Sequence, residues 1–173
     1  MTWHLRANFV RKTAIVVALA APLALGAAGA TAGAQPTAVL PVPVVTGPEI
    51  GPGGVPGGLF QTVSVTATPG DQPGTLTFAA ATPAPYNTQY NYRWLTVQWR
   101  NLRTGATGAV DLRHWIDAGN TVEKSYAATL PLQATALTGA GPVVVTVAHE
   151  REQFQAPPQS TAIVPGFGVV MVP

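Results

Sequence analysis

The sequence predicts an all-β fold, namely a two-sheet antiparallel sandwich of immunoglobulin-like type with about 7–8 strands. Two observations predict it. Short runs alternate between apolar and polar residues with a period of two, as half-buried strands do. Segments rich in Gly, Pro, Asn and Asp separate these runs at the spacing typical of strands in sandwiches. A closed β-barrel is the alternative architecture. The runs occupy residues 59–173, which we expect to form one domain.

The first runs of this domain show the alternation clearly. QTVSVTAT (61–68) places Val63, Val65 and Ala67 on one face and hydroxyl-bearing residues on the other. PGDQPG is dense in turn-forming residues. TLTFA follows this turn, and in it Leu76 and Phe78 alternate with threonines. We therefore expect two strands joined by a tight turn.

The middle of the chain predicts a β-hairpin. A strand over about residues 89–102 is followed by RTGATG (103–108), which supplies two glycines for a turn, and by AVDLRHW (109–115). Val110 and Leu112 then lie opposite the core face of the first strand.

The second half is less regular. SYAATLPLQATAL (125–137) reads as one strand broken at Pro131 or as a strand followed by a loop, and Pro131 disfavours a helix there. PVVVTVAHERE (142–152) is a strong strand with Val143, Val145 and Val147 on one face. QAPPQ interrupts the pattern, and STAIVPGFGVVMVP predicts two short strands around a Pro-Gly turn.

The first 34 residues have the parts of a secretory signal peptide. Arg6, Arg11 and Lys12 precede the uncharged run TAIVVALAAPLALGAAGA and the small-residue stretch ATAGAQ. We expect cleavage after Ala34 and export by the general secretion route, because no Arg-Arg pair is present. The protein is then secreted or held in the cell envelope, without a transmembrane helix. An uncleaved membrane anchor is the alternative.

Residues 35–58 contain six prolines and six glycines, which predicts a tail or linker. A single short strand from AVL or VPVV could still dock on a sheet edge, where proline is tolerated.

The charge excludes one class of partner. The chain has nine Lys and Arg against seven Asp and Glu, but three of the nine lie in the signal, so the mature chain has six minus seven, a net charge of −1. Without a basic patch we expect no nucleic-acid partner. The chain has no cysteine, so the exported domain must be stabilised by its own core, or by metal, partners or assembly, and not by disulfides.

Residues able to perform chemistry are few, and we expect no enzyme, no cofactor and no metal. No serine lies in a G-x-S-x-G motif, and HERE (149–152) lacks the second histidine of a zinc-protease helix. The alternative is a small hydrolase or metal-binding protein that uses His114 and His149. It requires those two side chains to lie close together.

The aromatic residues of YNTQYNYRWLTVQW (86–99) form either part of the core or a surface that binds a ligand. On a regular strand, Leu95, Val97 and Trp99 face the core, and Tyr90, Tyr92 and Trp94 face outward as a speculative ligand-binding surface. A β-bulge near residues 93–95 would instead return the second set to the core. The Pro-rich tail or another loop could also cover these rings.

The residues YNYRWLTVQWRNLRTGATGAVDLRHW and QFQAPPQ carry a resemblance. Together they resemble a group of small, uncharacterised exported actinobacterial proteins, over about the last two-thirds of the chain. The resemblance implies export and an all-β fold, and it transfers no catalytic or binding residue.

These observations predict an exported, non-enzymatic β-sandwich of the cell envelope or extracellular space. It would bind a glycan, lipid or protein through Tyr90, Tyr92 and Trp94. A structural protein that self-associates through sheet edges is the alternative.

Overall fold

The computed structural model describes residues 37–45, 49–50, 56–57, 60–117 and 125–173. These residues belong to one unit of the chain, Ala34–Pro173. The predicted signal peptide, its cleavage after Ala34 and the possible membrane anchor lie outside the described residues. Within the described residues, we find no helix with the length and apolar character needed to cross a membrane.

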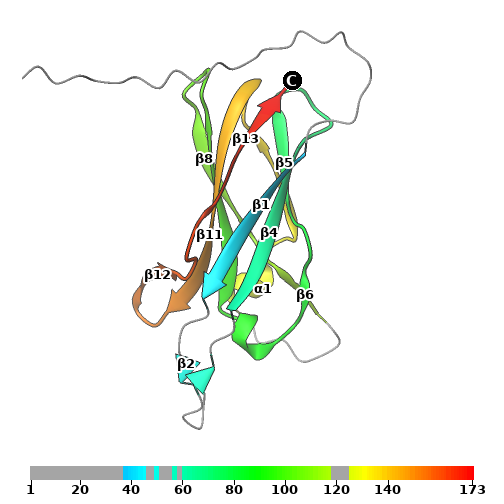
Figure 1. Cartoon of the computed structure of the whole chain (residues 1–173). Coiled ribbons are helices and arrows are strands. Elements are labelled where there is room, and N and C mark those ends of the chain that lie inside the picture. Colours follow the sequence, from blue (N-terminus) through cyan, green and yellow to red (C-terminus); the bar gives the residue numbers. More distant parts are fainter. Residues whose placement is uncertain (1–36, 46–48, 51–55, 58–59, 118–124) are drawn as a thin grey trace, which may run out of the picture. The chain divides into compact units, whose positions relative to one another are not determined.

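The alternating runs form two antiparallel sheets (Figure 1). The first sheet has the strand order β1-β4-β5-β10, with bounds Ala38–Val45, Phe60–Pro69, Thr75–Ala80 and Gln133–Leu137. The second has the order β12-β11-β7-β8, with bounds Ala156–Ser160, Gly141–Gln153, Arg93–Asn101 and Thr107–Leu112. Strand β13, Gly166–Val172, also pairs with β11.

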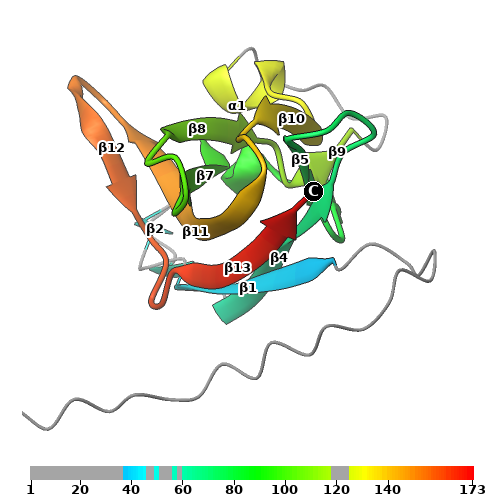
Figure 2. The same ribbon diagram turned by 90° about the horizontal axis from the view of Figure 1, so that it is seen from above.

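The two sheets pack face to face, and Figure 2 shows β1 and β4 in one layer and β7 and β8 in the other. Their inner faces supply the buried core, as alternation predicts. It includes Val63, Val65, Ala67, Leu76, Phe78, Leu95, Val97, Leu112, Val143, Val145 and Val147, with Trp99 and Val110 packed against it. The described strands do not close into a barrel, so the sandwich prediction is confirmed and the barrel alternative is excluded.

Strand β1 corrects the predicted start of the domain. Residues 38–45, which lie in the predicted tail or linker, pair with β4 along their whole length. Leu40, Val42 and Val44 are buried, so this segment belongs to the core. The sandwich therefore begins at Ala38 and not at residue 59. Prolines at positions 41 and 43 are tolerated because β1 is an edge strand, where part of the backbone N–H groups need no partner.

Where the sheets meet, β1 lies beside β13, and glycine allows the close approach. A Cβ atom on Gly168 would lie 2.5 Å from Leu40 Cδ2, and one on Gly166 would lie 2.9 Å from Val42 Cγ2. A side chain at position 168 would have to displace the Leu40 side chain, and one at position 166 would press on the Val42 side chain and on the backbone of β1.

Two segments differ from the sequence prediction in the second half. Residues 126–129 form a one-turn helix, α1 (Tyr126–Thr129), because the Ser125 hydroxyl caps it by accepting a hydrogen bond from the Ala128 N–H. The predicted interruption QAPPQ contributes to strand β12, which forms a hairpin with β11. The predicted first strand of STAIV instead makes a single bridge, Ala162 to Val44. The two main sheets thus hold nine described strands.

Short elements complete the chain. They are β2 (Glu49–Ile50) paired with β3 (Pro56–Gly57), β6 (Ala84–Pro85) paired in parallel with β9 (Trp115–Ile116), and the 3₁₀ helix η1 (Thr88–Tyr90).

Candidate functional site

The outer face of the second sheet carries a tryptophan near the start of β7. The β7 ladder runs in regular register against both neighbours, with Trp94 opposite Glu150 of β11. Because Leu95 and Val97 face the core, alternation turns Trp94 outward. Its side chain is nevertheless only 5% exposed. Something outside the sheet therefore covers this ring.

Helix α1 provides part of that cover. The Tyr126 ring meets Trp94 edge to face, with ring centroids 5.0 Å apart and planes at 80°. The helix is fixed at its start, since the Ser125 hydroxyl donates to the backbone carbonyl of Asn91 and lies 2.9 Å from Asn91 Oδ1. Asn91 is itself buried. The position of Tyr126 over Trp94 is thus set by a cap and a buried polar contact.

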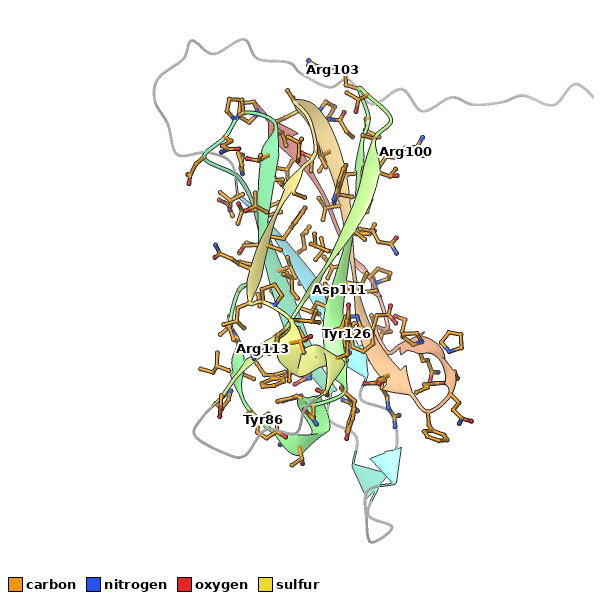
Figure 3. All side chains as sticks on the ribbon, turned by 180° about the vertical axis from the view of Figure 1, so that it is seen from behind. Tyr86, Arg100, Arg103, Asp111, Arg113 and Tyr126 are labelled. Carbon is orange, nitrogen blue, oxygen red and sulfur yellow. The ribbon has the colours of Figure 1, made fainter. Side chains whose placement is uncertain are left out.

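A chain of hydrogen bonds orients the carboxylate beside these rings. Trp94 Nε1 donates to Thr96 Oγ1 at 3.1 Å, and that hydroxyl donates to Asp111 Oδ1 at 2.7 Å. Tyr126 Oη donates to Asp111 Oδ2 at 2.7 Å, and Figure 3 shows the two residues side by side on β8 and α1. The hydrogen bond to Asp111, together with desolvation and the carboxylate charge, raises the pKa of Tyr126 to about 12.

The β11–β12 hairpin forms the opposite wall. Glu152, Gln153, Ala156 and Pro158 line a cavity of about 400 Å³ together with Trp94, Asp111 and Tyr126. Gln153 Nε2 donates to Gln159 Oε1 at 2.6 Å across the hairpin. We call these seven lining residues the α1 cleft. Its volume lies in the range of pockets that hold small ligands or single side chains.

Glu150 adds a further negative charge next to the cleft. Burial raises the pKa of this carboxyl, and the nearby charge of Asp111 raises it further.

The three residues predicted to share an outward surface do not share one. Tyr90 lies in η1, where its ring contacts His114 at 5.3 Å and its hydroxyl donates to Gln61 Oε1 at 3.1 Å. Tyr92 lies in the turn before β7 and is 47% exposed. Trp94 alone lines the cleft. The strand begins at Arg93 and not near residue 89, because the chain turns through η1 first.

The register also decides between the alternatives for Trp94. No bulge interrupts β7, so the bulge alternative is wrong. Trp94 faces outward and is covered by another segment, which here is α1 with the hairpin.

The two histidines of the enzyme and metal alternative do lie together. His114 Nε2 and His149 Nε2 are 3.2 Å apart, and His149 Nδ1 lies 2.6 Å from Thr161 Oγ1. Both side chains are buried. Burial and the charge of Arg93 lower the pKa of His114, and burial, His114 and Arg93 lower that of His149. Both rings are therefore neutral at pH 7, and one can donate to the other.

This pair does not fit a metal centre or a catalytic site. It offers two nitrogen ligands, and among the described residues no three His, Cys, Asp or Glu side chains gather around a common point. The charge of Arg93, which acts on both rings, opposes a second cation. Since both rings are sealed from solvent, a substrate has no access to them.

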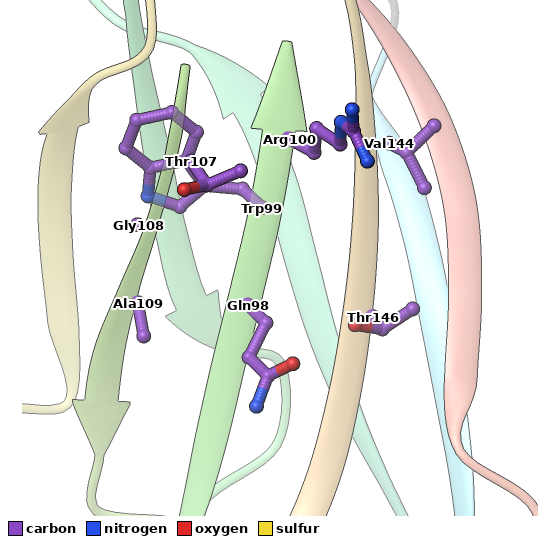
Figure 4. A pocket seen from close by; sticks show the side chains of 8 residues that line it. All are labelled: Gln98, Trp99, Arg100, Thr107, Gly108, Ala109, Val144 and Thr146. Carbon is purple, nitrogen blue, oxygen red and sulfur yellow. The ribbon is translucent and has the colours of Figure 1, made fainter. Parts of the chain in front are cut away.

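A second depression, of about 510 Å³, lies farther along the same sheet (Figure 4). Its lining comes from β7, β8 and β11 and includes Gln98, Arg100, Thr107 and Val144. The Trp99 ring lies against Gly108, where an added Cβ would meet Trp99 Cζ2 at 2.5 Å, so this ring packs on the strand. The depression has no wall outside the sheet, unlike the α1 cleft.

Comparison with known proteins gives no relative from which a function could be transferred: no family model matches the chain, and no curated protein or solved structure does.

Proposed function

We propose that this chain is an exported, non-enzymatic binding protein of the cell envelope or extracellular space, and that the α1 cleft is its ligand site. One observation carries the site. An outward-facing tryptophan on the second sheet is enclosed by Tyr126 on one side and by the β11–β12 hairpin on the other, and a cavity is left between them. Aromatic walls with a few fixed polar groups are typical of ligand pockets. Export rests on the amino-terminal sequence.

The binding role fits the chemistry of the cleft better than catalysis does. Its lining residues include no serine, threonine or histidine. Asp111 accepts two hydrogen bonds from neighbouring side chains, which fix its orientation. Such a group holds a ligand donor in a defined direction, whereas a general base needs to reach a proton on a nucleophile.

A binding screen with the full chain tests this proposal. Soluble glycans, lipid vesicles and peptides are titrated into isotope-labelled protein, and the amide resonances that shift are mapped. We expect a ligand to shift residues of the α1 cleft and the Tyr126→Ala variant to lose at least about tenfold in affinity, since a contacting aromatic ring contributes on this scale. Tyr126 is 47% exposed, so this variant should fold.

Phe167→Ala is the matched control, because Phe167 is an exposed aromatic on β13, away from the cleft. If ligands shift only residues outside the cleft, or if both variants lose affinity equally, the cleft is not the site.

Self-association remains a second candidate because of one feature of β13. Phe167, Val169 and Met171 are each more than half exposed on its outer face. Such a row of apolar side chains is a typical contact surface between subunits. Analytical ultracentrifugation over a range of concentrations tests it, and a Val169→Lys variant should dissociate any dimer formed through this row. A monomer at all concentrations excludes this candidate.

A further inference from the structure

The α1 cleft has an excess of negative charge. Asp111 and Glu152 line it, and Glu150 lies next to it, opposite Trp94. The charges of Glu150 and Asp111 act on each other, which is one reason why the pKa of Glu150 is raised. Like charges held this close cost free energy unless a cation joins them.

The arginines nearest in sequence point elsewhere. Arg93 and Arg151 are directly opposite each other in the β7–β11 ladder, so their side chains share one face. Arg93 is buried on the core side, where its charge acts on His114 and His149. Alternation therefore directs both arginines away from the face that carries Trp94 and Glu150.

Arg113 is also occupied elsewhere. Its guanidinium lies 4.9 Å from the centroid of the Trp115 ring, and it donates to the Ala128 carbonyl at 3.3 Å. The seven residues that line the α1 cleft include two acids and no lysine, arginine or histidine.

The walls of the cleft suit a flat, delocalised cation. Tyr126 is half exposed and offers a ring to which a guanidinium can stack, while Pro158 and Ala156 can contact an aliphatic stem. A carboxylate whose orientation is fixed, as that of Asp111 is, suits the bidentate geometry of arginine better than the point charge of an ammonium.

The hairpin beside the cleft points to a polypeptide as the carrier of that cation. Phe154, at its tip, is 91% exposed and directly follows Gln153 of the cleft wall. An exposed aromatic next to a charged pocket is a typical anchor of a protein–protein contact.

We propose that the α1 cleft binds an arginine side chain of a polypeptide partner. Charge complementarity favours this ligand, since two carboxylates, Asp111 and Glu152, line the cavity between the aromatic walls and a third, Glu150, lies beside it. This inference rests on the proposed function, because it specifies the ligand class of the same site.

Titration of the full chain with hexa-arginine, hexa-lysine and hexa-citrulline peptides tests it. Citrulline matches arginine in shape but carries no charge. We expect hexa-arginine to bind most tightly and hexa-citrulline not to bind, with resonance shifts in the cleft and weaker binding at high salt. Glu152→Gln should weaken hexa-arginine binding about tenfold, the scale of one charge-assisted hydrogen bond. Because Glu152 is exposed, this variant should fold.

Asp71→Asn is the matched control. Asp71 is an exposed acid in the turn between β4 and β5, so its loss should leave affinity unchanged. Equal weakening by both variants, or equal binding of hexa-citrulline, would overturn the arginine proposal. If a neutral glycan or a phosphatidylcholine vesicle shifts the cleft while hexa-arginine does not, the arginine proposal fails and the binding function stands. If no ligand shifts the cleft, both fail.

Discussion

The two ends of the sandwich differ in how they provide hydrogen-bond partners for the polar groups left where strands stop. At one end, which we call the turn end, the strands are joined by the tight turns β4–β5, β7–β8 and β10–β11 (Figure 1). At the other, the cleft end, the chain passes through η1, α1 and the β11–β12 hairpin. Both ends must satisfy the polar groups left where strands stop.

At the turn end, backbone hydrogen bonds within the turns and one buried side chain, Asn101, satisfy many of them. Asn101 Nδ2 donates to the carbonyls of Thr138, Gly139 and Ala140 at 2.9, 3.0 and 3.1 Å, and Oδ1 accepts from the backbone N–H groups of Arg103 and Thr104. At the cleft end, Asp111 accepts two hydrogen bonds from side chains, and the carboxylates of Glu150 and Glu152 lie near it. The turn end is thus joined by many internal hydrogen bonds, whereas the cleft end gathers acidic side chains, which in our proposal serve a ligand.

The largest expected effect comes from breaking the turn end. Asn101→Ala leaves several buried carbonyls and N–H groups without partners, which should lower the free energy of unfolding by about 3 kcal/mol. Urea denaturation of the full chain measures it. Thr104→Ala, at an exposed residue of the same turn, is the control and should cost less than about 1 kcal/mol. Equal losses in the two variants would show that Asn101 does not organise this end.

A smaller loss of stability is expected at the cleft end when the pH is lowered, because His114 and His149 are buried there as neutral rings. The folded pKa values of His114 and His149 are lowered from 6.5, so the unfolded state binds protons more readily. Their contribution is complete above about pH 6.5 and is lost as the pH falls, by about 1 kcal/mol for each histidine between pH 6.5 and about pH 5.5. Urea denaturation across this range measures the slope.

The control for this slope is the double variant His114→Gln with His149→Gln, whose profile should be flatter. Glu150 acts in the opposite direction, because a raised pKa favours the folded state at low pH, and it is the same in both proteins. A wild-type profile as flat as that of the variant would contradict the buried neutral pair.

The smallest effect tests the cleft wall. Tyr126→Phe removes one partly exposed hydrogen bond to Asp111 and should cost less than about 1 kcal/mol. The absorbance of tyrosinate provides the sharper measurement, since the wild type should contain one tyrosine with a pKa of about 12 that this variant lacks. Asp111→Asn should return that pKa toward the ordinary value of 10.0. If the high-pH titration of Asp111→Asn equals that of the wild type, Asp111 is not the cause of the raised pKa of Tyr126.

Much of the fold could be predicted because strand alternation is local. The faces that carry Val63 and Val65, Leu95 and Val97, and Val143 and Val145 follow from their spacing alone, and all are buried. The proline-rich segment of β1 was predicted as a tail with an edge strand as the alternative, and the structure shows the edge strand. The prolines of β12 concealed a second strand, because composition alone reads QAPPQ as an interruption. Helix α1 was not predicted, because Pro131 disfavours a helix over residues 125–137; the cap residue Ser125 is the local signal that could have revealed it.

The sequence by itself determined that this chain is all-β, and that on a regular strand Leu95 and Val97 lie on the face opposite to Trp94, because neighbouring side chains on a strand alternate. The regular register of β7 in the structure decided that Trp94 faces outward. Only the tertiary structure decided that Trp94 is covered, that His114 meets His149, and that Asp111, Tyr126, Glu152 and Pro158 surround one cavity. These contacts join segments far apart in the chain. Their positions depend on strand register and on the path of the connections, which no local pattern specifies.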